Sequence, residues 1–344
     1  MNSTHGLLTV TPVPAFAATY DAFQVADIAA AMAERHEFPY EYTYLGVGSR
    51  YWSDQAEMST ADSASSDPTP WLIATHAAEV VALLRPGRAA RVVDLGPGTG
   101  SGVHGLMAYL SIVDRLDSYR AVDISPDLLA MSARRLRGAF PDAVGRIHVH
   151  EGDFTGEALD VAMSRGTDRI VVIAGGTLHN LRDPDLLLRR VAARSDRTDL
   201  LMVTLRVEPE SGLPEFMRRV HTGRTLKPQK RLGLDLCGID PAWYDTELGY
   251  NPVARELFTR VRLLRPVDVV FEGRTARFAA GDTVTVWRYR YLTAADVERQ
   301  LGHAGWTVRL RIIAPPGGRT GVAAGDHVLF VATPVRQCVS GTGT

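Results

Sequence analysis

Acidic side chains follow three successive apolar runs in the first half of the chain. Asp94 ends the run at residues 91–95, Asp123 ends the next one, and Asp153 follows the third. If these runs are parallel strands, their carboxyl ends share one edge of a sheet. A carboxylate at Asp123 could accept hydrogen bonds from both hydroxyls of a ribose, and one at Asp153 from an adenine amino group. These residues therefore predict a site for an adenosine-containing ligand.

A glycine-rich turn follows the first run, with glycine at positions 96, 98 and 100. Glycine lets the backbone turn tightly and approach a ligand closely, and a helix from about residue 101 would offer free N–H groups. Such a turn could bind NAD, FAD or S-adenosylmethionine (SAM), or be only a tight turn. Position 101 is serine, so the Gly-x-Gly-x-x-Gly spacing of a dinucleotide site is absent. Together with the acidic strand ends, the pattern favours SAM.

The fourth apolar run, residues 169–174, leads into the sequence Gly-Gly-Thr-Leu-His-Asn, which ends at Asn180. An imidazole titrates near neutral pH, so His179 could act as a general base. It could equally shape the wall of the site or bind backbone. Asn180 could position a polar group of the substrate, or it could cap the following helix. Both alternatives remain open for each residue.

The elements that must position these residues follow an alternating strand and helix pattern. A fifth strand is expected at residues 199–206, a helix capped by Thr293 at 292–301, and two final strands at 307–313 and 326–332. This order predicts an α/β fold, the doubly wound, Rossmann-like sheet of class I SAM methyltransferases with an antiparallel last strand. Ligands of such sheets bind at the carboxyl ends of the strands.

We expect four regions along the chain. They are an N-terminal helical segment or substrate lid (1–85), a SAM-binding core (86–206), an inserted substrate-cap subdomain (207–291), and a C-terminal completion of the sheet (292–335). In the N-terminal region we expect loose chain to residue 16, helices at 20–36 and 71–84, and a loop at 59–70. The insertion is too long for an ordinary loop. Its short strand-like runs at 261–264, 267–271, 275–278 and 283–289 predict a partly β subdomain.

Composition excludes several classes of function. The chain has 344 residues, 45% of them hydrophobic, and a net charge of −1 without long runs of like charge. We therefore expect a small-molecule substrate rather than nucleic acid or a membrane as partner, and a monomer or homodimer. No run approaches the ~20 apolar residues of a membrane helix, and we see no signal peptide. Two cysteines, Cys237 and Cys338, suit a reducing cytoplasm. No metal-ligand spacing occurs.

Several short motifs make the chain resemble the histidine-specific α-N-methyltransferase family of ergothioneine biosynthesis. Residues 41–49 are similar to the family's Tyr-x-Tyr-Asp-x-x-Gly-Ser segment, residues 94–100 to its glycine loop, and 175–180 to its Gly-Ser-Thr-Ile-Gly-Asn. Residues 122–125 and 152–154 match its two acidic strand ends. The resemblance implies SAM as cofactor, and Asn180 as the residue that binds the substrate's amino group. The cofactor contacts expected from the motifs and the resemblance together are Tyr42, Tyr44, Asp94, Gly96, Gly98, Gly100, Asp123, Asp153 and Phe154.

The chain departs from this family where substrate is recognised. The family's aromatic Pro-Glu-Tyr-Tyr-Pro segment has no aromatic counterpart at 59–67, and its Thr-Glu-x-Ser motif corresponds to Val-Trp-Arg-Tyr at 286–289. Trp287 and Tyr289 thus replace a carboxylate and a hydroxyl. They share one strand face and could line a flat aromatic pocket, or they could be core. Tyr250, Trp243 and Tyr244 have the same ambiguity.

These departures lead to a substrate hypothesis. We expect methylation of an indole carbon or nitrogen in a tryptophan-derived natural product such as a cyclic dipeptide, with His179 accepting the proton. The alternative is α-N-methylation of a free amino acid, histidine or tryptophan, held by Asn180. From other classes, a nicotinamide-dependent oxidoreductase and a non-catalytic nucleotide-binding module remain. His148 and His150 are expected to be structural on a core strand. Glu34, His36 and Glu37 are expected on a solvated face.

Overall fold

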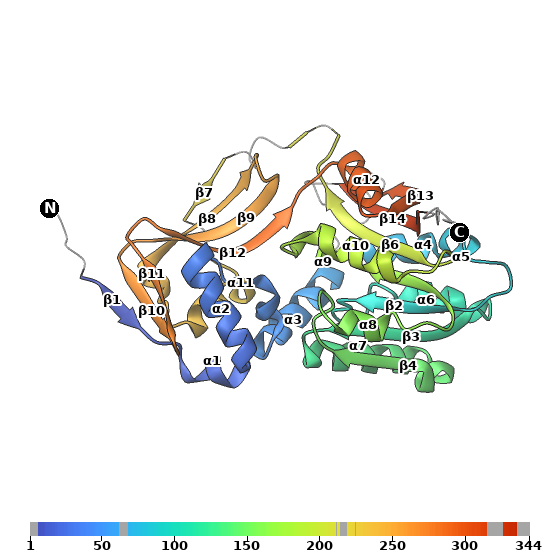
Figure 1. Ribbon diagram of the computed structural model, residues 1–344, viewed down its shortest axis with the longest axis horizontal. Helices are drawn as coiled ribbons and strands as arrows, with labels where there is room; N and C mark the ends of the chain where they lie inside the picture. The colour runs from blue at the N-terminus through green and yellow to red at the C-terminus, as the bar shows by residue number, and fades with distance from the viewer. Residues whose placement is uncertain are drawn as a thin grey trace, which may run out of the picture. The chain divides into compact units, whose positions relative to one another are not determined.

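The structure is a computed structural model that describes residues 6–61, 68–210, 212–213, 219–223, 225–314 and 326–335 (Figure 1). The chain divides into two compact units. Unit 1 comprises residues 1–55 and 211–291, and unit 2 comprises residues 56–210 and 292–344. Each unit is therefore built from two separate stretches of chain. The segment 56–85, grouped in the sequence with the N-terminal region, clusters with the sheet of unit 2.

Unit 2 contains a seven-stranded sheet in the order β13-β14-β6-β5-β2-β3-β4. All neighbouring strands are parallel except β14, which is antiparallel to both β13 and β6. The predicted methyltransferase sheet with an antiparallel last strand is thus confirmed. Its strands are β2 (Ala90–Leu95), β3 (Leu116–Asp123), β4 (Ile147–Glu151), β5 (Asp168–Ile173), β6 (Leu200–Val207), β13 (Trp306–Ile313) and β14 (Asp326–Pro334).

Helices cover both faces of this sheet (Figure 1). One face buries side chains of α8, α10 and α12 against the strands, and the other buries side chains of α4 to α7. Because strand residues alternate, Val93 of β2 belongs to the first core and Val92 to the second. The helices are α4 (Thr69–Thr75), α5 (Ala77–Ala82), α6 (His104–Ile112), α7 (Pro126–Ala139), η2 (Pro141–Arg146), α8 (Ala158–Ala162), α9 (Thr177–Asn180), α10 (Pro184–Arg194) and α12 (Ala294–His303).

Some local predictions in unit 2 hold and others need correction. Thr293 caps α12 in a capping box with Asp296, as predicted. The single helix expected at 71–84 is two helices, which meet at His76. The loop expected at 59–70 is wrong at its start, because α3 continues through Ala61. Residues 62–67 lie outside the described chain. β4 is an edge strand rather than a core strand, so His148 is exposed.

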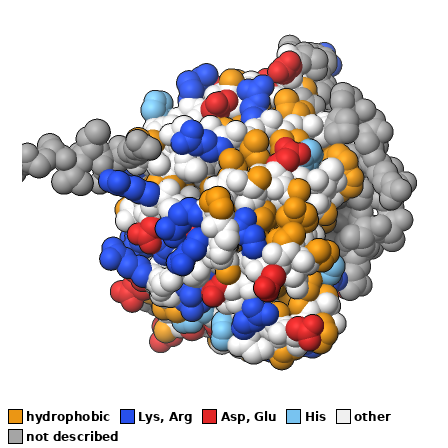
Figure 2. Space-filling model, turned by 90° about the vertical axis from the view of Figure 1, so that its right-hand side faces the viewer, with side chains coloured by type: hydrophobic (Ala, Val, Ile, Leu, Met, Phe, Trp, Pro, Cys, Tyr) orange, Lys and Arg blue, Asp and Glu red, His pale blue; other side chains and the backbone are white. Residues whose placement is uncertain are grey.

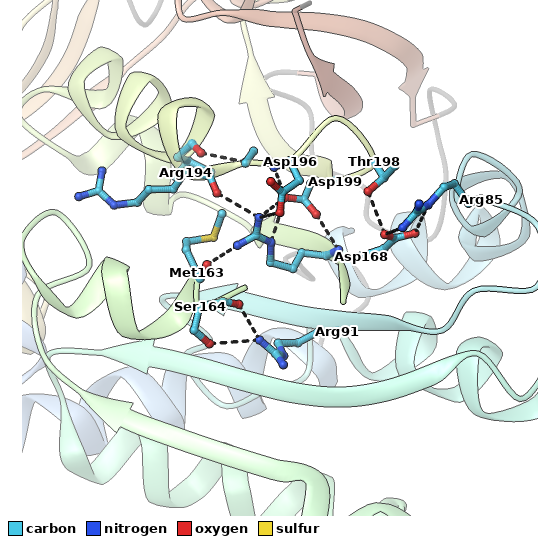
Figure 3. Close-up of polar contacts among 12 residues, drawn as sticks. Arg85, Arg91, Met163, Ser164, Asp168, Arg194, Asp196, Thr198 and Asp199 are labelled. Carbon is cyan, nitrogen blue, oxygen red and sulfur yellow. Dashed lines mark hydrogen bonds and ion pairs between the residues drawn. The ribbon is translucent and has the colours of Figure 1, made fainter. Parts of the chain in front are cut away.

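A buried ion pair ties β5 to β6 at the amino ends of the strands, opposite the edge predicted to bind ligand. The side chains of Arg169 and Asp199 are both 0% exposed. Arg169 Nε donates to Asp199 Oδ2 over 2.9 Å and Nη2 donates to the same oxygen over 2.6 Å. The guanidinium also donates to the carbonyls of Met163 and Arg194 and to Asp196 (Figure 3). Every guanidinium nitrogen thus has a partner, which is the condition for burying such a charge.

Unit 1 contains two small sheets, in the orders β1-β10-β11 and β12-β9-β8-β7. The partly β insertion is therefore observed, with β10, β11 and β12 close to their predicted limits. The elements are β1 (Leu8–Val10), α1 (Pro14–Thr19), α2 (Ala22–Arg35), η1 (Tyr40–Tyr44), α3 (Val47–Ala61), β7 (His221–Thr222), α11 (Pro228–Leu236), η4 (Pro241–Trp243), β8 (Tyr244–Asn251), β9 (Glu256–Leu263), β10 (Val267–Phe271), β11 (Arg274–Phe278) and β12 (Thr283–Arg290). The boundary between the units falls within α3.

The N-terminal stretch of unit 1 is more ordered than predicted. Residues 8–10 are not loose but pair in parallel with β10, and α1 begins at Pro14. The helix expected at 20–36 begins at Ala22, because Asp21 and Gln24 form a capping box.

The residues at the end of α2 that were expected to face solvent form contacts with strands of the insertion. Glu37 pairs with Arg288, and Glu34 pairs with Arg274. His36 has a left-handed backbone (φ 50°) and packs against Phe278. The strands of the insertion supply partners that local sequence does not reveal.

Candidate active site

The carboxyl edge of the unit 2 sheet brings the predicted strand-end residues together. Asp94 lies near the end of β2, Asp123 ends β3, and Asp153 follows β4 by two residues; these strands are neighbours. Phe154 also lies at this edge, since a Cβ added to Gly96 would lie 3.5 Å from its ring carbon Cε1 and 3.0 Å from a methyl of Thr177. The glycine loop, the acidic strand ends and the start of α9 therefore lie together at the carboxyl edge of this sheet.

The glycine loop has the backbone that its sequence predicts. Gly96, Gly98 and Gly100 have φ angles of 75°, 55° and 75°. These angles are in the left-handed region that side chains disfavour. A Cβ at Gly98 would meet nothing within 4 Å, whereas one at Gly100 would lie 2.6 Å from Ser132 Oγ. Gly100 is thus required for packing, while Gly98 borders open space that a ligand can occupy.

The two buried carboxyls of this edge accept hydrogen bonds from neighbouring residues, and burial raises the pKa of both. Tyr119 Oη donates to Asp94 Oδ2 over 2.9 Å, and Asp94 Oδ1 has no hydrogen-bond partner among the described residues. Ser125 N–H donates to Asp123 Oδ1 over 2.9 Å, and the N–H of Gly98 also donates to this carboxylate. Burial raises the pKa of Asp94 to about 7 and that of Asp123 to about 6. Asp94 Oδ1 is therefore an acceptor available to a ligand.

Asp153 and Asn180 complete this edge in different ways. The exposed Asp153 accepts hydrogen bonds from the N–H and the hydroxyl of Thr155, each over 2.7 Å. Asn180 ends α9, and its Oδ1 is buried without a hydrogen-bond partner among the described residues. A buried carbonyl oxygen in this state can accept a hydrogen bond from a bound amine or amide.

His179 lies in the interior of unit 2. Its side chain is 0% exposed, and Nε2 lies 3.3 Å from Gln300 Oε1. The amide nitrogen of Gln300 donates to Asp185 Oδ1 over 2.7 Å. Because the Asp185 carboxylate only accepts, the Gln300 carbonyl must face the imidazole, and His179 must carry its proton on Nε2. This relay fixes the orientation of His179 beside Asn180.

Unit 1 gathers the aromatic residues that were ambiguous in the sequence. Trp287 and Tyr289 stack with their ring centroids 6.1 Å apart and 16° between planes, so they do share a strand face. Tyr250 packs into the same group. Tyr40 contacts Trp287 with centroids 6.5 Å apart, and Tyr44 and Trp52 extend the contacts. We call Tyr40, Tyr44, Trp52, Trp287 and Tyr289 the aromatic cluster.

Other expected residues of unit 1 lie elsewhere. Tyr42, expected at the cofactor, is buried, and its hydroxyl donates to Asp27 over 3.1 Å. Trp243 lies in η4, and Tyr244 begins β8. Tyr40 and Trp52, which belong to the cluster, and Lys230, which contacts it, were not predicted from the sequence. The one signal for Lys230 is composition, because it is one of only two lysines in the chain.

Comparison with known families identifies this arrangement. Residues 25–211, just over half of the chain, match the model of the family described as histidine-specific methyltransferase, SAM-dependent. The chain belongs to this family. The protein is therefore an S-adenosylmethionine-dependent methyltransferase, and the nicotinamide-dependent and non-catalytic alternatives are set aside. The sequence has no significant match among curated proteins.

One solved structure supports the fold, and two further ones are similar to this chain over most of their length. A SAM-dependent methyltransferase from Clostridium acetobutylicum is 12% identical with a TM-score of 0.50, covering 85% of this chain and 100% of that one. The CcbJ methyltransferase from Streptomyces caelestis is 19% identical, with a TM-score of 0.46 and coverage of 77% and 90%. The glycopeptide N-methyltransferase MtfA in complex with SAM is 19% identical, with a TM-score of 0.43 and coverage of 76% and 93%.

The residues of the methyltransferase at this edge fit SAM. Asp94 Oδ1 offers an unpartnered acceptor suited to an ammonium group, and the space over Gly98 admits a ligand. Asp123 and Asp153 would hold the ribose and the adenine. When bound, SAM supplies a methyl group that its sulfonium makes electrophilic.

Acidic and basic side chains occur together on the face in Figure 2, as the net charge of −1 suggests. Among the described residues, no group of three or more His, Cys, Asp or Glu side chains could hold a metal ion. Within the same residues, no helix has the length and apolar character needed to cross a membrane.

We expect the affinity for SAM to rise as the pH rises from about 5.5 to about 8. The pKa values of Asp94 and Asp123 are raised from 3.8 to about 7 and about 6. The two carboxyls therefore lose their protons as the pH rises through this range. Their ionisation weakens the ligand-free fold as the pH rises, and a cationic ligand offsets that loss. Calorimetric Kd values between pH 5.5 and 8.5 measure the effect.

A matched variant, Tyr119→Phe, tests the same dependence of SAM affinity on pH. Tyr119→Phe removes the hydrogen bond that lowers the pKa of Asp94, so the rise in affinity should move to higher pH. A Kd that stays constant across this range would show that neither carboxyl meets the cofactor in its ionised form.

Proposed function

We propose that the protein methylates the indole ring, at carbon or nitrogen, of a tryptophan-derived small molecule such as a cyclic dipeptide. The observation that carries this proposal is the aromatic cluster of unit 1. Trp287 and Tyr289 stand where the resembling histidine methyltransferases have a glutamate and a serine, and both rings are stacked rather than scattered. Trp287 is partly exposed, so a planar ligand would contact the part of its ring that Lys230 and Tyr289 leave uncovered.

Histidine suits this cluster poorly. An imidazole and an amino acid backbone carry several polar groups that lose water on binding and then need partners. Trp287 offers one indole N–H, and the Tyr289 ring is 6% exposed. Arg288, between them, is paired with Glu37. A site that leaves polar groups unpaired rejects such a substrate strongly.

The residues at the carboxyl edge of the unit 2 sheet would bind the cofactor and hold a polar group of the substrate. Asp94, Asp123, Asp153 and the loop at Gly98 hold the cofactor, and Asn180 Oδ1 holds an N–H group of the substrate. We propose that His179 positions Asn180, since the relay through Gln300 and Asp185 fixes its ring and its proton. Precise alignment of nucleophile and methyl group supplies most of the rate enhancement in such reactions.

A second candidate function is α-N-methylation of a free aromatic amino acid. It is favoured by one observation, the unpartnered and buried Oδ1 of Asn180. This oxygen could accept a hydrogen bond from the amine that is methylated. The family description also points to an amino acid substrate.

Methyl transfer across a substrate panel tests both candidates. The panel contains histidine, tryptophan and cyclic dipeptides with and without tryptophan, each incubated with SAM and read by mass spectrometry. We expect ring-methylated products from the tryptophan-containing cyclic dipeptides and at most traces from histidine. Cyclic dipeptides without an aromatic ring are the matched control.

Two results would contradict the proposal. Histidine methylated as fast as every indole would restore the plain family activity. Tryptophan methylated only at its amine would favour the second candidate, and Asn180→Ala should then abolish the reaction.

A further inference from the structure

Thr204 is a polar residue within an apolar, buried stretch of β6. The first six residues of this strand are all buried, and the other five are leucine, methionine or valine. Thr204 is 2% exposed. Its Oγ1 accepts a hydrogen bond from the N–H of Gly175 over 2.7 Å and lies 3.2 Å from Thr69 Oγ1. A valine would fill nearly the same volume, so the hydroxyl group itself is what this position requires.

The hydrogen bond to Gly175 lies where β5 leaves the sheet. The last pair of the ladder between β5 and β6 joins Ile173 to Val203. Gly175 follows two residues later with a left-handed backbone, φ 69°, and its N–H needs an acceptor outside this ladder. The Thr204 hydroxyl is that acceptor, and it ties the start of the turn to the neighbouring strand.

The turn that begins at Gly175 leads to two residues of the candidate active site. Thr177 reaches the glycine loop, since its methyl group would lie 3.0 Å from a Cβ added to Gly96. Asn180 ends α9 and carries the buried Oδ1 that we assign to the substrate. A displacement at Gly175 would therefore be passed to both residues.

Side chains on both faces of the sheet hold this turn. Val203 and Leu205 face the core that contains α12, so Thr204 faces the other core, together with α4 to α7. On the α12 side, His179 contacts Gln300 over 3.3 Å. Thr204 thus fixes the start of the turn from one face, and Gln300 fixes its end from the other.

We propose that Thr204 is a positioning residue for the methyl transfer. Its hydroxyl holds Gly175 and, through the turn, sets the place of Asn180 at the carboxyl edge of the sheet. The inference rests on the proposed function in one respect, the use of Asn180 to hold a polar group of the substrate. It does not depend on the substrate being an indole.

The experiment compares kcat of the wild type, Thr204→Val and Thr204→Ser, with SAM and the panel compound that the wild type methylates fastest. Valine leaves the Gly175 N–H without its acceptor, and the resulting misplacement of Asn180 should lower kcat by about 10- to 100-fold. Serine keeps a hydroxyl and should restore most of the rate. The Kd of SAM should change far less than kcat, because Asp94 and Asp123 lie outside this turn.

Thr198→Val is the matched control. The Thr198 hydroxyl donates to Asp168 Oδ1 over 2.9 Å, and Asp168 begins β5, at the end of the strand opposite the turn. Each threonine-to-valine substitution removes one hydroxyl that links β5 or its turn to the segment of β6. Both should lower Tm, and only Thr204→Val should lower kcat of the folded enzyme.

Hydrogen exchange at the amide of Gly175 reports on the hydrogen bond itself. Exchange should be faster in Thr204→Val than in the wild type, close to the wild type in Thr204→Ser, and unchanged in Thr198→Val. Mass spectrometry of peptides that span residues 174–181 measures it.

Three results would refute the role of Thr204. In the first, a folded Thr204→Val keeps its kcat although exchange at Gly175 becomes faster, so the hydrogen bond is only structural. In the second, exchange does not change, so the hydrogen bond does not protect the turn. In the third, Thr204→Ser loses as much kcat as Thr204→Val, so the hydroxyl is not the group that matters.

Failure of the proposed function is seen separately. If the wild type methylates histidine and no indole, the indole proposal fails. The same three variants, compared with histidine as the methyl acceptor, then decide the role of Thr204.

Discussion

Asp199→Ala should lower the free energy of unfolding by about 3–5 kcal/mol. The substitution removes the buried partner of Arg169, whose side chain is fully buried, and leaves the half-exposed carboxylate of Asp196 as the remaining acidic partner of the guanidinium. It also removes the acceptor of two backbone N–H groups, those of Arg169 and Asp196. Urea denaturation, followed by circular dichroism and by tryptophan fluorescence, measures the change.

Asp196→Ala is the matched control for this prediction. Asp196 also accepts from Arg169 Nη2, over 3.0 Å, but its side chain is 54% exposed. Exposed ion pairs contribute little, so a loss below about 1 kcal/mol is expected. A double variant, Arg169→Met with Asp199→Leu, should recover much of the loss of Asp199→Ala, because it removes both charges. Equal losses for Asp196→Ala and Asp199→Ala would show that burial does not set the energy of this pair.

Asp123→Ala should weaken SAM binding by about 1.5–3 kcal/mol, which is roughly 10- to 150-fold in Kd at pH 8. The carboxylate ends β3 and is held by the N–H groups of Ser125 and Gly98. Its loss removes a charged acceptor for ribose hydroxyls and also frees the glycine loop. Calorimetry at pH 8, where the carboxyl of the wild type is ionised, gives the largest difference.

Asp117→Ala controls for the loss of an acid from the same strand. Asp117 lies at the other end of β3, with 40% of its side chain exposed, and should leave the affinity unchanged. Asp123→Asn tests charge, because it keeps an oxygen that can accept from Ser125. If a folded Asp123→Ala variant binds SAM as tightly as the wild type, the ribose assignment fails.

The cofactor half of the protein was predictable because its signals are local. Asp94 lies near the end of β2 and Asp123 ends β3, and adjacent parallel strands must present such ends at one edge. The glycines at 96 and 98 mark the turn because their φ angles, 75° and 55°, lie in the left-handed region that residues with a Cβ disfavour. The N-cap residue Thr293 likewise predicted the start of α12, because capping is a local signal.

The rest depends on contacts between distant segments, which local patterns do not contain. Lys230 and Trp287 are far apart in sequence and meet because α11 packs against β12. The burial of His179 depends on Gln300, which is supplied by a helix more than a hundred residues later. Pairing of residues 8–10 with β10 could not be read from a short Thr- and Pro-rich stretch.

The division of each unit between two stretches of chain has a consequence for synthesis on the ribosome. β1 pairs with β10, with Leu8 opposite Val267. β1 therefore cannot join its sheet until β10 has been synthesised, when most of the chain has left the ribosome. β14 inserts between β13 and β6, and it ends at Pro334. Neither unit can complete its sheets cotranslationally from an early segment, and the high contact order predicts slow folding. Until β14 has been synthesised, the edge of β6 that pairs with β14 is open and apolar, and an open strand edge of this kind favours aggregation.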